Sequence, residues 1–209
     1  DCGISDLAEV RWAQENGIDL VVTDHHEPPE EIPPAFAVIN PKCVDSGYPY
    51  KELAGAGVAL KLGQALLEAA GHGSEVWRDY LDLACLGTIA DIVPIQGENR
   101  ILVKHGLPAL ACSSCPGIKA LIEISGIKDK NIGTREVAFG LAPRLNAAGR
   151  IGAPELALQL LLSDHYSEAV ELAGRLNRAN QERQRIEAAV LEEALVMLDS
   201  IQEKKESFV

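Results

Sequence analysis

A carboxylate and two imidazoles stand together early in the chain, in the triplet Asp24-His25-His26. The triplet follows the short apolar run Leu20-Val21-Val22, which predicts a buried strand. Ligands of open α/β sheets bind at the carboxyl ends of the strands. Three polar, metal-capable side chains are not expected in a core, so we interpret the triplet as a site that binds a divalent cation or orients a phosphate. A polar strand end with one solvated histidine is the alternative, and we do not favour it for a triplet followed by Glu-Pro-Pro.

Two further aspartates could complete such a site. Asp1 opens the chain in Asp-Cys-Gly, where the glycine permits a tight turn and close approach to a ligand. Asp91 lies between apolar neighbours, where a carboxylate is costly unless it is paired or bound to a metal; a helix N-cap or a salt bridge with Arg100 is an equally open alternative. Such ligands suit Mn²⁺, with Mg²⁺ possible although less suited to imidazole. With Asp24 and His25, the two aspartates would make one metal site and only part of a second.

A later segment is rich in hydrogen-bond donors. Small residues within 140–152 bring the backbone close to a ligand, and Arg144, Asn146 and Arg150 supply donors for phosphate oxygens. A helix C-cap with surface arginines is the alternative. The stretch 135–185 holds seven of the ten arginines and no lysine, whereas the net charge of −12 argues against a generic nucleic-acid coat. Ion pairs on a helix surface are expected for at least half of Arg175, Arg178, Arg183 and Arg185.

Hydrophobic periodicity and the glycine and proline positions predict the elements that must position these residues. A helix over 6–16, a strand over 18–23, a proline-rich loop and a strand over 36–39 form a helix–strand–loop–strand unit of a parallel sheet. Helices are then expected over 54–70, 75–89, 98–111, 116–125, 134–141 and 154–162. One extended helix over 166–205 follows, and its polar middle at 177–185 is expected in solvent or along a groove.

The predicted fold class is therefore α/β, with a partial parallel-sheet domain at 1–95, a helical continuation at 96–163 and a long connector helix at 164–209. No stretch approaches the roughly 20 apolar residues of a membrane span. The odd count of five cysteines fits thiols of a reducing cytoplasm, with Cys112 and Cys115 as loop thiols. Because the chain opens on an aspartate without an initiator Met, we expect it to be an excised part of a longer protein.

Several segments together carry a resemblance to a known family. They are Asp1–Ile4, Val22–Glu27, Ile39–Lys42, Leu53–Val58, Gly87–Pro94, Gly97–Arg100 and Arg144–Arg150. In this order they resemble the RecJ-like single-strand-specific 5′→3′ DNA exonucleases of bacteria, within the DHH phosphoesterase superfamily. Asp-His-His alone is typical of the superfamily, and its combination with Arg-Leu-Asn-Ala-Ala-Gly-Arg is typical of the RecJ-like members.

The resemblance implies a role for each residue of the candidate metal site. Asp1, His25 and Asp91 would be metal ligands, with Asp1 bridging two Mn²⁺ ions. Asp24 would orient its neighbour or bind the metal weakly. His26 would contact the scissile phosphate, which makes Asp24 and His26 the candidate catalytic residues.

The resemblance also implies what the whole protein does. Arg144, Asn146 and Arg150 would hold the phosphates of single-stranded DNA, and the long helix would lead to a second domain that clamps the strand. The implied activity is metal-dependent hydrolysis in DNA repair and recombination, in the cytoplasm and without a membrane, with a single-strand-binding protein and a helicase as partners. The family's upstream Asp-x-Asp-Gly segment and its downstream glycine- and histidine-rich domain lie outside the match, which implies an active parent protein and an inactive or very weak fragment.

Two other functions remain open at the level of sequence. Another branch of the superfamily would hydrolyse short oligonucleotides, cyclic dinucleotides or pyrophosphate, but the segment Arg144–Arg150 and the long helix weigh against it. A non-catalytic replication scaffold of the same fold would be expected to lose metal ligands, whereas Asp1, His25, His26 and Asp91 are all present. We therefore expect a nuclease core.

Overall fold

The computed structural model describes residues 2–73, 75–127, 132–150 and 152–203. They form two compact units. The first unit consists of the described residues of 1–113 and 128–142, and the second consists of those of 114–127 and 143–209. The chain therefore enters the second unit briefly, returns to the first and ends in the second. Whether the three stretches expected from the sequence are separate domains stays a prediction.

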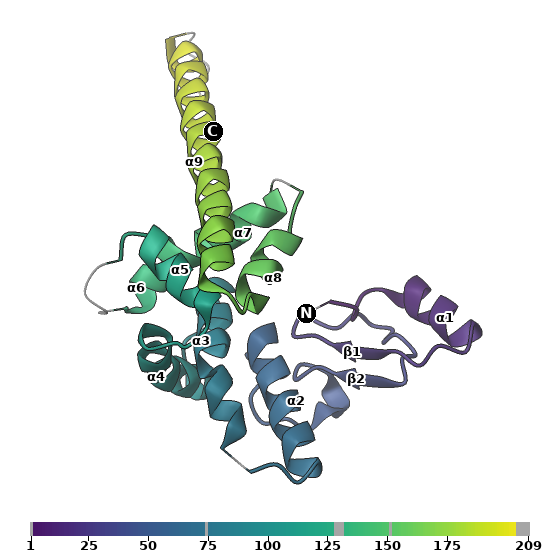
Figure 1. Cartoon of the computed structure of the whole chain (residues 1–209). Coiled ribbons are helices and arrows are strands. Elements are labelled where there is room, and N and C mark those ends of the chain that lie inside the picture. The colour runs from purple at the N-terminus through teal and green to yellow at the C-terminus, as the bar shows by residue number, and fades with distance from the viewer. Residues whose placement is uncertain (1, 74, 128–131, 151, 204–209) are drawn as a thin grey trace. The chain divides into compact units, whose positions relative to one another are not determined.

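The first unit combines a small parallel sheet with helices (Figure 1). Its elements are α1 (Leu7–Glu15), β1 (Val21–Thr23), β2 (Ala37–Ile39), the 3₁₀ turn η1 (Val44–Ser46), α2 (Gly55–Ala69), the 3₁₀ turn η2 (Val76–Tyr80), α3 (Leu81–Ala90), α4 (Gly97–Ala111), α6 (Thr134–Glu136) and the π-helix η3 (Val137–Leu141). This arrangement confirms the α/β fold class. Two expected helices are divided: a separate 3₁₀ turn precedes α3, and the helix over 134–141 widens into a π-helix.

The two strands pair in parallel, with Val22 opposite Val38. Val22 is 2% exposed but Val21 is 51% exposed, so the expected buried strand is buried on one face only. Successive side chains of a strand face opposite sides of a sheet, and Val21 lies on the side that the described residues leave open. The pairing continues past the strands, where Asp24 N–H donates to the carbonyl of Ile39 at 3.0 Å. The residues that follow both strands are thereby brought to the same edge of the sheet.

The core of the first unit lies between α2, α3 and α4. Its buried side chains are Leu53, Val58, Leu60, Ala84 and Leu102, and Tyr48, Tyr50, Trp77 and Leu81 pack against them. Helices α3 and α4 approach closely because Gly106 has no side chain, and a Cβ there would lie 2.3 Å from Cys85 Cβ. This packing fixes the carboxyl end of α3, where Asp91 is the C-cap residue.

The second unit is helical and is built on one long helix. α5 (Pro116–Ile124) and α8 (Glu155–Leu162) pack against α9 (Tyr166–Glu203), and α7 (Ala142–Arg150) precedes α8. α9 spans 38 residues, which confirms the expected extended helix (Figure 1). Its polar middle is not wholly in solvent, because Asn180 is 3% exposed and accepts a hydrogen bond from Arg183 Nε. Among the described residues, no single helix is long and apolar enough to cross a membrane.

Candidate metal and phosphate site

Asp24 lies directly after β1 and organises the loop that carries both histidines. Its side chain is 1% exposed. Oδ1 accepts hydrogen bonds from the backbone N–H groups of His25 at 2.7 Å and His26 at 3.1 Å, and Oδ2 accepts one from Ile4 N–H at 3.1 Å. Burial by itself raises the pKa of Asp24, but its hydrogen bonds outweigh burial and lower the pKa to about 2. The expectation that the triplet stays out of the core is therefore wrong for Asp24, whose charge is satisfied by the backbone.

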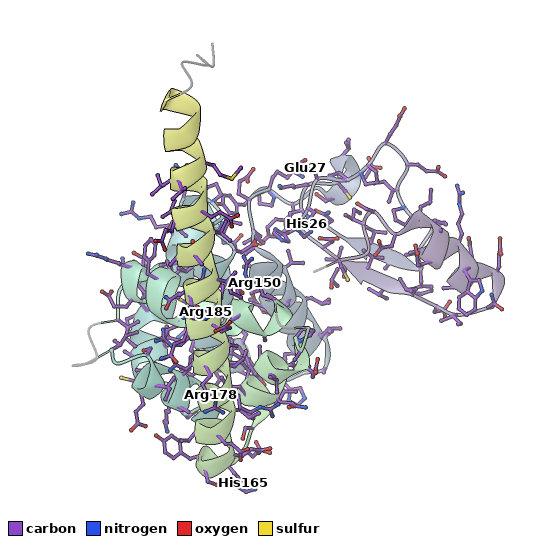
Figure 2. All side chains as sticks on the ribbon, turned by 90° about the horizontal axis from the view of Figure 1, so that it is seen from above. His26, Glu27, Arg150, His165, Arg178 and Arg185 are labelled. Carbon is purple, nitrogen blue, oxygen red and sulfur yellow. The ribbon has the colours of Figure 1, made fainter. Side chains whose placement is uncertain are left out.

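His26 is held by Asp24 with most of its ring exposed. His26 Nδ1 lies 2.7 Å from Asp24 Oδ1, and the His26 side chain is 60% exposed. Because Asp24 is ionised at neutral pH, the Nδ1–H group donates to it, which directs Nε2 away from Asp24. Figure 2 shows His26 and the neighbouring Glu27 on the loop that follows β1. The ring is thus oriented to contact a ligand through Nε2.

His25 and Asp91 meet from different elements. His25 is 6% exposed, and its Nε2 lies 3.4 Å from Asp91 Oδ2. Burial lowers the pKa of His25, and His26 and Lys42 act in the same direction, while Asp91 and Asp24 oppose them. A neutral imidazole is the form that binds a metal ion. Two ligand atoms held by one ion at about 2.1 Å lie about 3.0–3.4 Å apart, so this pair fits two ligands of a single divalent cation.

Asp91 does not lie in the apolar surroundings that its sequence neighbours suggest. Its side chain is 37% exposed, and the following Ile92 is 89% exposed. Asp91 ends α3 instead of capping a helix N-terminus, and it faces His25 instead of Arg100. Both structural alternatives considered for Asp91 are therefore wrong, and it stays a candidate metal ligand.

The triplet itself forms a compact group of possible ligands. One ligand atom from each of Asp24, His25 and His26 lies within 4.8 Å of the others, and the centroids of the two imidazole rings are 4.4 Å apart. The structure thus brings the triplet together with Asp91. Asp1, the expected bridging ligand, lies outside the described residues.

Asn40 belongs to the site, although the sequence did not reveal its role. It is 2% exposed just after β2, its Nδ2 donates to the carbonyl of His26 at 2.9 Å, and its Oδ1 accepts from Lys42 N–H at 2.9 Å. Lys42 Nζ forms an ion pair with Glu27 at 2.8 Å. Asn40 thereby fixes the His26 loop from the neighbouring strand. The sequence signal that could have identified Asn40 was the Asn-Pro pair at the end of the predicted strand. A buried amide at that position needs hydrogen-bond partners, and nearby loop backbone can supply them.

The expected phosphate segment is helical and lies in the second unit, on α7. Asn146 and Arg150 are exposed and four residues apart, which places them on one face of the helix. Arg144 is partly buried, its Nε donates to Asn177 Oδ1 at 2.9 Å, and burial lowers its pKa. Arg144 therefore helps to join α7 to α9. The role of all three residues in phosphate binding stays a prediction.

The arginines of α9 are partly engaged within the helix. Arg183 Nη1 lies 2.6 Å from Glu187 Oε2, and Arg185 Nη2 lies 2.7 Å from Glu182 Oε1. These two pairs confirm that at least half of the four arginines expected on this helix form ion pairs. Figure 2 shows Arg178 and Arg185 along α9. Exposed pairs of this kind contribute little to stability.

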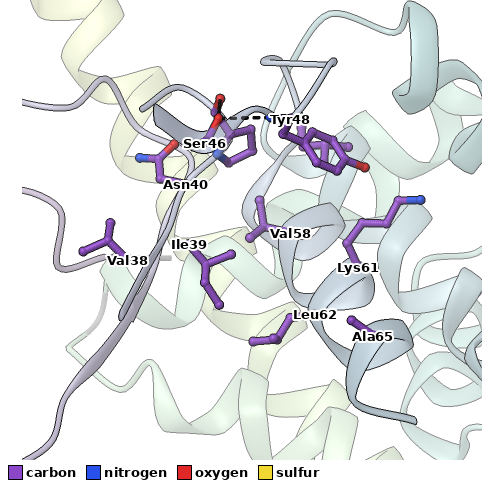
Figure 3. A pocket seen from close by; sticks show the side chains of 11 residues that line it. Val38, Ile39, Asn40, Ser46, Tyr48, Val58, Lys61, Leu62 and Ala65 are labelled. Carbon is purple, nitrogen blue, oxygen red and sulfur yellow. Dashed lines mark hydrogen bonds between the residues drawn. The ribbon is translucent and has the colours of Figure 1, made fainter. Parts of the chain in front are cut away.

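A cavity of about 340 Å³ lies elsewhere in the first unit, between β2, η1 and α2 (Figure 3). Val38, Ile39, Val58 and Leu62 supply apolar walls, and Asn40, Ser46, Tyr48 and Lys61 supply polar atoms. Tyr48 N–H donates to Ser46 Oγ at 3.4 Å within this lining. Its lining includes no carboxylate or imidazole, so this cavity is not the candidate metal site.

Comparison with known proteins gives matches over nearly the whole chain. Residues 1–88 match the DHH family, N-terminal domain. The chain is 43% identical over 199 residues to the single-stranded-DNA-specific exonuclease RecJ of Bacillus subtilis, covering 95% of this chain and 25% of that protein. A crystal structure of RecJ from Thermus thermophilus in complex with Mn²⁺ matches with a TM-score of 0.83 and 44% identity, covering 92% of this chain and 28% of that one. A crystal structure of RecJ from Thermus thermophilus in complex with Mg²⁺ matches with a TM-score of 0.68 and 40% identity, covering 85% of this chain and 26% of that one.

The parallel sheet with Asp-His-His at its edge lies within residues 1–88, which match the DHH family, N-terminal domain. The chain is similar, over 92–95% of its length, to the RecJ exonucleases. The chain spans only 25–28% of the length of these relatives. The resemblance inferred from its motifs is confirmed.

Proposed function

We propose that this chain is the metal-binding part of a metal-dependent exonuclease that hydrolyses single-stranded DNA. The observation that carries the proposal is the His25–Asp91 pair beside the oriented His26, in a chain that is 43% identical to an exonuclease of that specificity. The proposed cofactor is Mn²⁺, with Mg²⁺ as a possible substitute, since related RecJ structures contain these ions.

Each residue of the site has a proposed role. His25 and Asp91 hold the ion, together with Asp1, and these imidazole and carboxylate donors fit Mn²⁺. When bound, the ion supplies an activated water and stabilises negative charge on the phosphate. Asp24 holds the loop and orients His26, whose exposed Nε2 contacts the phosphate to be cleaved.

The finer features rest on the likeness to RecJ. We propose 5′→3′ polarity, a two-metal mechanism, a role in DNA repair and recombination in the cytoplasm, and a single-strand-binding protein and a helicase as partners. Arg144, Asn146 and Arg150 are proposed to contact phosphates of the strand. Because the chain spans 25% of its Bacillus relative, we propose that the full-length protein is active and that the 209-residue chain alone has little or no activity.

The test compares the full-length protein containing this chain with its variants on a 5′-labelled single strand and on a matched duplex. We expect hydrolysis of the single strand only, dependent on Mn²⁺. His26→Ala and Asp91→Asn should each lower the rate at least about 100-fold. His72→Ala, which alters an exposed histidine of the same unit, is the control and should leave the rate unchanged.

Three outcomes would contradict the proposal. Activity in the presence of a chelator would exclude the metal, and a parental rate in Asp91→Asn would exclude this site. Hydrolysis by the 209-residue chain at the rate of the full-length protein would contradict the proposal that this chain alone has little or no activity.

A further inference from the structure

The turn that follows Asp91 is strained. Ile92 has a φ of +59° although it is β-branched. Residues of this kind rarely adopt the left-handed region, and they persist there only where surrounding contacts impose the conformation. Ile92 is 89% exposed, so its own side chain does not supply those contacts. The contacts that hold it must therefore come from residues that bind the connection between this turn and α4.

Asn99 and Tyr50 supply hydrogen bonds to the segment that connects this turn to α4. Asn99 is completely buried in the first turn of α4, and its Nδ2 donates to the carbonyl of Pro94 at 3.1 Å and to that of Glu52 at 2.5 Å. The hydroxyl of Tyr50 donates to the carbonyl of Gln96 at 2.8 Å and lies 3.4 Å from that of Pro94. The turn is thereby tied to the segment that precedes α2.

Gly97 and Glu98 complete the same arrangement. Gly97 has a φ of +47°, and a Cβ there would lie 2.6 Å from Cε2 of the Tyr50 ring. Glycine thus allows both the backbone conformation and the approach of the tyrosine. Glu98 accepts a hydrogen bond from Tyr48 OH at 2.8 Å and pairs with Lys61 Nζ at 2.6 Å. Residues 97–99 therefore join the turn, the loop before α2 and α2 itself.

We propose that Tyr50 and Asn99, here called the Tyr50–Asn99 clamp, are positioning residues that hold the strained turn at Ile92 and so keep Asp91 against His25. A turn released from the clamp would relax toward negative φ, and the end of α3 would move away from the 3.4 Å contact with the imidazole. The inference rests on the proposed metal-binding role of Asp91 and extends that function to residues that offer no ligand atom themselves.

The test uses the whole 209-residue chain with two readouts. Without metal, the His25 ring nitrogens in a long-range ¹H–¹⁵N NMR spectrum report the contact with Asp91, and Asp91→Asn gives the reference for its loss. The electron paramagnetic resonance signal of free Mn²⁺ gives the Kd for the ion. Tyr50→Phe and Asn99→Ala should both move the His25 signals toward those of Asp91→Asn and raise the Kd about 10-fold.

A rescue variant separates positioning from general destabilisation. Glycine adopts a φ near +59° without strain, so Ile92→Gly added to Tyr50→Phe should restore the His25 signals and bring the Kd to within about 3-fold of the parent. Ser113→Ala is the matched control, because it breaks another buried hydrogen bond of this unit, to Asp82 at 2.6 Å. This control should lower the Tm and change neither readout.

The two proposals fail differently. Unchanged His25 signals in Tyr50→Phe and Asn99→Ala would overturn the clamp, as would a failure of Ile92→Gly to rescue. If Asn99→Ala does not fold, Tyr50→Phe with and without Ile92→Gly decides the question. A parent chain that shows the expected NMR changes but binds no Mn²⁺ would contradict the proposed metal site and leave the clamp standing.

Discussion

Asp24 shows how one buried side chain can determine the geometry of a site. Its oxygens accept hydrogen bonds from three backbone N–H groups and from His26 Nδ1. The two histidines are therefore directed to different sides: His26 toward solvent and His25 toward Asp91. A carboxylate is needed because every partner is a donor, and an amide would present its own NH₂ group to one of them.

Asp24→Asn should accordingly destabilise the first unit. Whichever way the amide turns, one buried N–H group faces another donor, which we expect to lower the free energy of unfolding by about 2–4 kcal/mol. Urea unfolding followed by circular dichroism measures the change. Asp19→Asn, at an exposed position before β1, is the control and should stay within about 0.5 kcal/mol of the parent. An equally small effect of Asp24→Asn would contradict the role assigned to its charge.

Tyr48 contributes to the free energy of unfolding by an amount that falls at alkaline pH. Burial, and then the hydrogen bond to Glu98, raise the pKa of Tyr48 far above its usual value of about 10. A raised folded-state pKa means that this contribution is complete below about pH 10 and is lost as the pH rises above that value. The free energy of unfolding should thus fall more steeply above pH 10 in the parent than in Tyr48→Phe.

The Tyr48 prediction is checked by urea unfolding between pH 8 and 11. At pH 8, Tyr48→Phe should be less stable by about 1 kcal/mol through loss of the hydrogen bond. Tyr80→Phe alters a tyrosine that is 53% exposed, and it should keep the parental pH profile. Parallel profiles for the parent and Tyr48→Phe would show that ionisation of the Tyr48 hydroxyl has no part in the alkaline loss.

At the scale of elements, replacing either of two helical glycines by alanine should change the stability, in opposite directions. A Cβ on Gly106 would lie 2.3 Å from Cys85 Cβ and 2.6 Å from the carbonyl oxygen of Leu81, so Gly106→Ala must push α4 away from α3. We expect a loss of at least about 2 kcal/mol. Gly63, within α2, has nothing within 4 Å, and Gly63→Ala should stabilise by about 0.5–1 kcal/mol because alanine favours the helix.

Thermal unfolding of both glycine variants measures the difference. Opposite shifts of Tm are expected, with Gly106→Ala below and Gly63→Ala above the parent. A Gly106→Ala chain as stable as the parent would mean that α3 and α4 can separate without loss, and that their packing does not fix the end of α3.

Most elements could be predicted because their signals are local. The apolar run before Asp24 and the proline-rich loop after it located β1, and the absence of helix breakers beyond Tyr166 located α9. The exposure of Val21 could not be predicted, since it depends on which face of the sheet is covered. The division of the helix over 75–89 into η2 and α3 was also not predicted, because no proline or glycine marks the boundary between them.

For the molecule as a whole, the site was predictable where it consists of chemically distinctive residues. Asp24, His25, His26 and Asp91 were singled out by type, and the structure brings them together. The residues that support them were not identified, because Asn40 and Asn99 donate to backbone carbonyls, and the Asn40-Pro41 pair marks a strand end without revealing which carbonyl the amide binds. The surroundings of Asp91 were misjudged because apolar sequence neighbours need not be its neighbours in space.

If the proposed site binds its ion in the folded chain only, Mn²⁺ must stabilise the fold. One site at a free ion concentration of about 100 times Kd adds about 2.7 kcal/mol to the free energy of unfolding. We expect urea midpoints of the parent chain to rise with Mn²⁺ and those of His25→Ala and Asp91→Asn to remain constant. His105→Ala, which removes an exposed histidine of the same unit, should respond like the parent. A rise of equal size in all four proteins would place Mn²⁺ binding outside this site, because the ion would then be stabilising the chain without either proposed ligand.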